Sequence, residues 1–405
     1  MEEIILALKR LFMNDILPLK RARAEEFGGH FQQALFSWDP AKFSKYSSAV
    51  NDFSSQQFRL WYKHHAGSGM ISGAGLSVLL TMMLYISDND SEQEFREMAD
   101  PAIFPNPALM GELLEALDRA DRWARFRLKN ALWYHQGIVM NSGIREAFKN
   151  FFQTSGGPLN FSSERAQQKV NSWAKEVSNG RISSFLELLQ GNMIFAQMIM
   201  MKGVWRNPFE KMGSRTDLFF PYDKRPVAIE MMRASGSFPV LKMPDWEAIF
   251  LPFGTESFSC ILAMPEKGQK LPDVHGIFEP AKWKKESAIS TVDISVSIPL
   301  FSLNTVTYFG PLLREMGLSQ VFDPEKADFS KMSEEPLWLD QVIQGVHFEV
   351  NETGIGDNRF AKTKLRQTPS EPNLPELIFN RPFYIAVIEN HTGLLLLQGV
   401  FEGDH

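Results

Sequence analysis

The residue types that most often catalyse reactions or bind metals are present in this chain but scattered. The only cysteine, Cys260, lies in an apolar run over residues 259–264, so no internal disulfide can form and a buried, unreactive thiol is expected. None of the eight histidines falls in a His-Glu-x-x-His arrangement. Phosphate-loop, nucleophile-elbow and dinucleotide-binding patterns are also missing from the sequence. We therefore expect no catalytic residues, no metal, no cofactor and no enzymatic activity.

One basic cluster is interleaved with aromatic residues. It comprises Arg119, Arg122, Trp123, Arg125, Phe126, Arg127 and Lys129. Such a cluster is compatible with a polyanion site, but the solvated end of a helix that runs into a strand is the commoner explanation. The formal net charge of -6 argues against nucleic acid or an anionic membrane surface as a partner.

The elements that must position any site change in type along the chain. Residues 1–50 are expected to form a helix-biased leader, because their apolar residues recur every three or four positions. Helical patterns follow at 53–63, 76–86, 108–124, 143–152 and 164–177, and strand patterns at 193–201, 248–251, 257–264, 289–298, 344–350 and 383–389. Because strands then follow strands, the order predicts an α+β fold with mainly antiparallel sheet.

Four separated segments resemble the serpin family. The first is Asn171-Ser172-Trp173-Ala174-Lys175 with the turn at 179–182, and the second is the Lys-Gly-x-Trp-like segment 201–209, which contains Trp205. The third is Ala327-Asp328-Phe329-Ser330, followed by a strand ending at Gly354. The last is Phe379-Asn380-Arg381-Pro382-Phe383 with Gly399. Together they cover residues 171 to 399 in the family's order.

The resemblance implies a serpin fold of three mainly antiparallel sheets with eight or nine helices, in one domain over residues 51–405. It also implies a monomer with an exposed reactive-centre-like loop at 354–378. In inhibitory relatives a serine protease cuts this loop, the loop inserts into the main sheet as an extra strand, and the protease is trapped.

The hinge of the loop departs from the inhibitory pattern. Insertion turns every second residue toward the core, so these positions should be small and apolar. One alternate set begins Ile355, Asp357, Arg359, and the other begins at Gly356 and contains Lys362 and Lys364, so each set carries two charges. Burying an ionised side chain costs several kcal/mol unless it is paired. The hinge residues Glu352, Gly354, Ile355, Asp357 and Arg359 therefore favour a non-inhibitory member.

The residues beneath the point where the sheet opens are also altered. The resemblance places this gate at Ser72, Gln197, Trp205 and Gln344. The family pattern Ser-Pro-x-Ser is replaced by 72–75, Ser-Gly-Ala-Gly, while glutamines stand where the family has an asparagine and a histidine. Either the gate is lost, or Gln197 and Gln344 rebuild a hydrogen bond between themselves.

The bond that a protease would cut is ambiguous. Counting from Gly354 points to Thr368-Pro369, whereas counting back from Phe383 points to Glu371-Pro372. Proline after the cleaved bond makes a poor substrate, so Arg366-Gln367 is the better site and suits a trypsin-like enzyme. Two hypotheses follow: a non-inhibitory serpin that binds a partner, carries a ligand or acts as a chaperone, and an irreversible inhibitor of a trypsin-like serine protease. The residues favour the first.

The compartment stays open. The N-terminal residues begin acidic and do not form a secretory signal, and no apolar run is long enough to span a membrane, which indicates a cytoplasmic protein. The resemblance, in contrast, points to the extracellular space.

Overall fold

A computed structural model describes residues 39–189, 191–274, 276–280, 283, 289–356 and 374–403. Asp357, Arg359 and the candidate scissile residues Arg366, Gln367, Thr368 and Pro369 lie outside these residues, as does most of the expected 1–50 leader.

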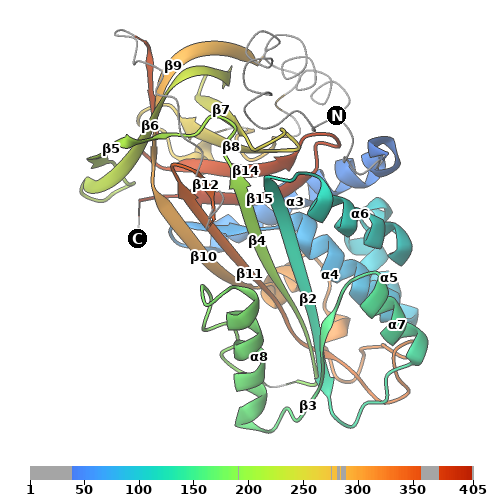
Figure 1. The fold of residues 1–405 in the computed structure, drawn as a ribbon. Coiled ribbons are helices and arrows are strands. Elements are labelled where there is room, and N and C mark those ends of the chain that lie inside the picture. Colours follow the sequence, from blue (N-terminus) through green and yellow to red (C-terminus); the bar gives the residue numbers. More distant parts are fainter. Residues whose placement is uncertain are drawn as a thin grey trace.

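A six-stranded sheet runs through the middle of the molecule (Figure 1). Its order is β10 (Phe301–Tyr308), β11 (Leu339–Asn351), β12 (Gly354–Ile355), β4 (Met193–Val204), β2 (Ala124–His135) and β3 (Ser155–Leu159). Strands β4 and β11 are parallel and hydrogen-bonded directly, with His347 opposite Met200. Strand β10 runs antiparallel to β11, and β2 runs antiparallel to β4 but parallel to β3. Strand β4 is buried along nearly its whole length, which explains its almost unbroken apolar sequence.

A nine-stranded sheet packs above the first. It contains β1 (Gly69–Ile71), β5 (Glu210–Phe219), β6 (Val227–Lys242), β7 (Trp246–Pro252), β8 (Phe258–Pro265), β9 (Ser290–Pro299), β13 (Glu376–Ile378), β14 (Phe383–Glu389) and β15 (Leu395–Phe401). Three sheets were expected, but β6 is long enough to pair with β5 near its start, with β9 over residues 231–240 and with β7 at its end. It thereby joins two of the expected sheets into one, and the mainly antiparallel α+β class is confirmed.

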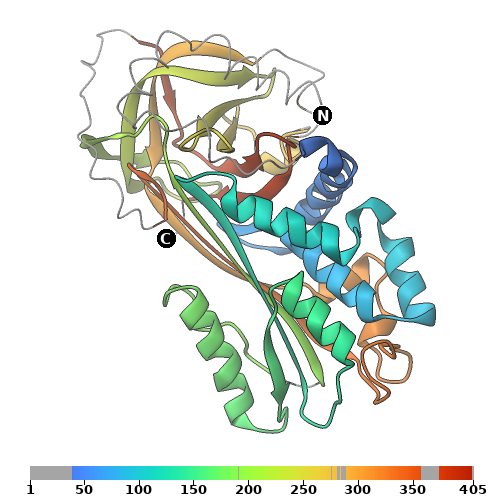
Figure 2. The ribbon, with the colours of Figure 1, turned by 45° about the vertical axis from the view of Figure 1, so that its right-hand side comes forward.

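The described residues contain seven α-helices: α3 (Ser44–His64), α4 (Gly73–Ile86), α5 (Asn89–Met98), α6 (Pro107–Arg119), α7 (Ser142–Asn150), α8 (Glu164–Val177) and α9 (Gly310–Glu315). Short 3₁₀ turns occur at 40–43, 101–103, 271–273 and 320–322. Figure 2 shows α3 to α7 gathered on one side of the six-stranded sheet and α8 alone on the other. The main core lies on the first side, and α8 covers a smaller core that contains Trp133, Phe185 and Ile343. None of the helices in the described ranges is long and apolar enough to cross a membrane.

Two sequence-based boundaries differ from the structure. The expected leader ended at residue 50, yet α3 runs from Ser44 to His64, because Tyr46, Val50 and Phe53 belong to one continuous buried stripe. The helix expected over 108–124 ends at Arg119, since Asp121 turns the chain by accepting hydrogen bonds from the Trp123 and Thr255 amides at 2.7 and 2.8 Å. The basic cluster is therefore a helix end that runs into a strand.

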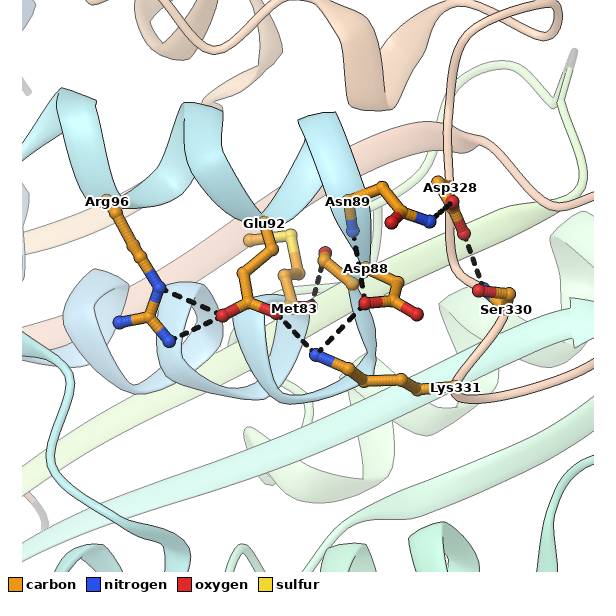
Figure 3. A network of polar contacts seen from close by, with 9 residues as sticks. Met83, Asp88, Asn89, Glu92, Arg96, Asp328, Ser330 and Lys331 are labelled. Atoms are coloured by element: carbon orange, nitrogen blue, oxygen red, sulfur yellow. Dashed lines mark hydrogen bonds and ion pairs between the residues drawn. The ribbon is translucent and has the colours of Figure 1, made fainter.

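A polar cluster joins α5 to the segment that carries the Ala-Asp-Phe-Ser pattern (Figure 3). The Asp328 carboxylate accepts hydrogen bonds from the Asn89 side chain at 2.8 Å and the Ser330 amide at 3.0 Å, which hold the pKa of Asp328 below its usual value. Lys331 pairs with Glu92 at 2.5 Å and lowers the pKa of that carboxyl group in the same way. These contacts fix the segment that leads into β11.

Candidate functional site

The hinge of the predicted loop occupies the top of the six-stranded sheet. Strand β12 lies between β11 and β4 and is antiparallel to both. Ile355 stands opposite Val350 on one side and Gly203 on the other. Its side chain is fully buried in the main core. Gly354 and Ile355, the first two residues of the predicted loop, therefore already form a strand in the six-stranded sheet.

Hydrogen bonds from the segment after β4 hold the hinge in place. The Trp205 indole donates to the Asn351 carbonyl at 2.8 Å, and the Trp205 amide donates to the Thr353 carbonyl at 3.0 Å. The Phe209 amide donates to the carbonyl of Glu352 at 2.9 Å, and Ser214 Oγ donates to its carboxylate at 2.8 Å. Trp205, which the resemblance placed in the gate, therefore holds the hinge instead.

The inserted strand stops at Gly356. Its φ of +75° lies in the left-handed region, and a Cβ there would lie 3.0 Å from the Met201 carbonyl oxygen and 3.2 Å from Lys202 Cγ. The Gly356 amide still donates to the Glu349 carbonyl at 2.7 Å. Any further insertion must first return Gly356 to an extended conformation.

The register of β12 decides which loop residues would face the core if insertion continued. Side chains alternate along a strand, so Asp357 and Arg359 would follow Ile355 into the main core. Extending the observed pairs places position 357 between Met201 and Phe348, and position 359 between Ile199 and Val346. These four neighbours are all apolar and no more than 2% exposed. The sequence left two registers open, and the hinge selects the one that buries an acid and a base among hydrocarbon side chains.

The gate is a closed chain of hydrogen bonds. Gln344 Nε2 donates to Gln197 Oε1 at 2.9 Å and to the Ser72 carbonyl at 3.0 Å, while Gln344 Oε1 accepts from the Ser72 amide at 2.8 Å. Gln197 Nε2 donates to the Gly75 carbonyl and to Asn130 Oδ1, each at 2.9 Å. The predicted bond between the two glutamines is confirmed, and it crosses the line along which the sheet would open.

Two members of this network were not found from the sequence. Asn130 on β2 is 1% exposed, stands opposite Gln197, and donates to the Phe152 carbonyl at 2.9 Å. The sequence signal that could have revealed Asn130 is its amide side chain within the otherwise mainly apolar second half of β2. Gly75 provides the space: a Cβ there would lie 2.3 Å from Gln197 Oε1 and 3.0 Å from Gln344 Nε2. The long glutamine side chains fit because the first turn of α4 lacks a side chain at this position.

His347 lies near the hinge on the opposite face of the same sheet. Its Nδ1 is 2.7 Å from Asn304 Oδ1, and the ring is 8% exposed. Burial, together with the positive charges of Arg181 and Lys202, lowers the pKa of His347 to about 4. The ring is neutral at physiological pH.

The lone thiol and the adjacent histidine pair are buried or engaged in other contacts. Cys260 is 1% exposed, and burial raises the pKa of its thiol. His65 stacks on Trp61 with ring centroids 4.1 Å apart, whereas its neighbour His64 turns to Glu315 at 3.1 Å. No group of three potential metal ligands occurs within the residues that the structure describes.

The basic cluster is divided by the fold. Arg119 ends α6 and pairs with Glu115 at 2.7 Å, and Arg122 lies over the Trp123 ring at 5.4 Å. Arg125 instead points from β2 onto the open sheet face. The Arg119, Arg122 and Arg125 set that was weighed as a polyanion site therefore comes from three places: the end of α6, the turn after it and β2.

Comparisons with known proteins agree with this geometry. The family model for Serpin (serine protease inhibitor) matches residues 48–402. Plasminogen activator inhibitor 1 from Neovison vison is 27% identical over 372 residues, covering 86% of this chain and 91% of the relative. The structure of human thyroxine-binding globulin complexed with thyroxine superposes with a TM-score of 0.77 at 18% identity, covering 89% of this chain and 98% of that chain. For mouse protein-Z dependent protease inhibitor the TM-score is 0.78 at 19% identity, with 90% and 98% covered.

The packing around Gly75 gives a test of the gate. Gly75→Ser should lower the free energy of unfolding by about 2 kcal/mol or more, because the new side chain overlaps Gln197. Adding Gln197→Asn, which is one methylene shorter, should recover at least about 1 kcal/mol of that loss. Chemical denaturation of the two single variants and the double variant measures this coupling.

The control is Gly143→Ser in the first turn of α7, where the nearest atom to a new Cβ is Asn141 Oδ1 at 3.3 Å. This exposed change should alter stability by less than about 0.5 kcal/mol. Strict additivity of Gly75→Ser and Gln197→Asn would contradict the account of the gate.

The buried His347 predicts a pH dependence. A histidine in the unfolded chain titrates near pH 6.5, so the unfolded chain binds the proton before the folded chain as pH falls. The stability that neutral His347 contributes above pH 6.5 is therefore lost between about pH 6.5 and 4. His347→Gln should flatten this part of the stability curve by about 1 kcal/mol, measured by urea unfolding across that range. His64→Gln, at an exposed histidine, should leave it in place, and an unchanged slope in His347→Gln would rule out this assignment.

Proposed function

Because the chain belongs to the serpin family, we propose that it is a non-inhibitory member, which binds a partner protein through the 354–378 loop and does not trap a protease. The proposal assigns it a binding, carrier or chaperone role without catalysis. The family contains both kinds of protein: relatives of this chain include a plasminogen activator inhibitor and a thyroxine-binding globulin complexed with thyroxine.

The position of Ile355 carries the proposal. With Ile355 in the core, continued insertion would place Asp357 and Arg359 among Met201, Ile199 and their neighbours on β11. Because Asp357 and Arg359 would occupy adjacent inward positions, they could form an ion pair. Removing both charges from water would still cost several kcal/mol, and the ion pair would recover only part of that cost. Inhibition requires this insertion to be strongly favourable.

The gate adds a second cost. An inserted strand would move β4 and β11 from neighbouring positions, about 4.8 Å apart, to about twice that distance. The bond between Gln344 and Gln197 would then break. Position 361, an alanine, would lie between the two glutamines and offers no side-chain partner. Each buried group left unpaired costs about 1–3 kcal/mol.

One observation favours the alternative function, irreversible inhibition of a trypsin-like serine protease that cuts after Arg366. The sheet already accepts Gly354 and Ile355 between β4 and β11, so its upper end is open to the loop. In this alternative, the Asp357–Arg359 pair and the gate would slow insertion without preventing it.

Incubation with trypsin followed by a denaturing gel separates the two functions. We expect the unmodified protein to be cleaved in the loop without forming an SDS-stable complex, because insertion is too costly to distort the protease. The variant Asp357→Thr/Arg359→Ala should raise the fraction trapped as a complex, since it removes the two inward charges.

The matched control changes the opposite face of the same segment, as Asn358→Ala/Lys362→Ala. It should leave the trapped fraction at the level of the unmodified protein. A stable complex formed by the unmodified protein would show that it is an inhibitor.

A further inference from the structure

The upper end of the six-stranded sheet has an open face that is rich in cations. Figure 1 shows α8 against the lower part of β2 and β4, with the upper ends of both strands extending beyond it. On the face toward α8, β2 presents Arg125, Arg127 and Lys129, and β4 presents Lys202. We call these four side chains the cationic row.

The fold holds two of these cations in an unfavourable arrangement. Arg125 and Lys202 are both exposed and stand directly opposite each other on neighbouring antiparallel strands. Like charges in such pairs destabilise a sheet. Neither residue, nor Lys129, forms an ion pair with any part of the chain that the structure describes, whereas Arg127 is 3.3 Å from Asp118. Arg125, Lys202 and Lys129 are therefore available to pair with an anionic ligand.

The surroundings reinforce the positive potential. Arg181 lies in the turn after α8 and pairs with Glu349 at 3.3 Å, so the charge of that neighbouring carboxylate is already balanced. The buried His347 next to it is held neutral partly by the charges of Arg181 and Lys202. The local field thus favours a negatively charged ligand although the whole chain is acidic.

The spacing of the row indicates the kind of ligand. Residues 125, 127 and 129 recur every second position along a strand, which separates them by about 6.6 Å per step. Alternate side chains of an extended peptide have the same spacing. Met200 stands opposite Arg127 and gives an adaptable apolar contact between the charges. The outward positions of 125–129 and 198–202 carry no Phe, Tyr or Trp on which nucleic acid bases would stack.

We propose that the cationic row binds an acidic segment of a partner protein in an extended conformation along β2, with carboxylates facing the Arg125–Lys202 pair at one end and Lys129 at the other. This inference goes beyond the proposed function and does not depend on whether the loop inserts. Because Lys202 Cγ lies against Gly356, a bound peptide would lie beside the hinge.

Fluorescence anisotropy with a labelled twelve-residue peptide of alternating glutamate and serine tests the proposal on the full chain. We expect binding that weakens as salt is raised, and an affinity about tenfold lower for Arg125→Gln/Lys202→Gln. The matched control, Lys149→Gln/Lys267→Gln, removes two exposed cations elsewhere and should retain the original affinity. The row variant should also melt at a higher temperature at low salt, because it removes the like-charge pair.

Two results would overturn the proposal. One is equal loss of peptide affinity in the row and control variants, which would indicate attraction by overall charge alone. The other is absence of peptide binding together with Arg125-dependent binding of a sulfated polysaccharide or single-stranded DNA, which would assign the row to a different class of ligand. A row variant that unfolds at a lower temperature would contradict the strain inferred for the Arg125–Lys202 pair.

Discussion

The insertion of Ile355 between β4 and β11 is the constraint on which the loop's behaviour depends. Side chains alternate along a strand, so this one buried residue fixes the orientation of every loop residue that could follow it into the sheet. The consequence is chemical: the next two inward positions are Asp357 and Arg359, and the strands between which they would lie offer only apolar neighbours. Insertion that begins with the apolar Ile355 would therefore have to continue with the charged Asp357 and Arg359.

The gate beneath the hinge has been rebuilt rather than lost. Gln344, Gln197 and Asn130 form a row of amides across three neighbouring strands, tied to the first turn of α4 at Ser72 and Gly75. The long glutamine side chains on β4 and β11 occupy the space that the absence of a side chain at Gly75 of α4 leaves free. Every amide hydrogen of the two glutamines has an acceptor, so the closed sheet satisfies this network and an opened sheet would not.

Much of the fold follows from local sequence signals. Helix α8 and strand β14 begin and end at the residues predicted, because Ser163 caps the helix and turn residues bound the strand. The start of α3, the end of α6 and the short β1 were not predicted, since they depend on burial against distant elements and not on local patterns. The bond between Gln197 and Gln344 was predictable, whereas Asn130 and the space at Gly75 required the register of three strands. The sequence could not choose between two loop registers with equal charge, and the cationic row became visible only when Arg125 and Lys202 were paired across strands.

The most direct test of the account compares the melting temperature of the intact protein with that of the protein cleaved by trypsin within the loop. If Asp357, Arg359 and the glutamine gate prevent insertion, cleavage should leave the melting temperature within about 2 °C of the intact value, since no new strand forms. An added strand that stabilised the protein by several kcal/mol would raise the melting temperature by about 10 °C or more. Such a rise would show that the loop inserts and would contradict the account.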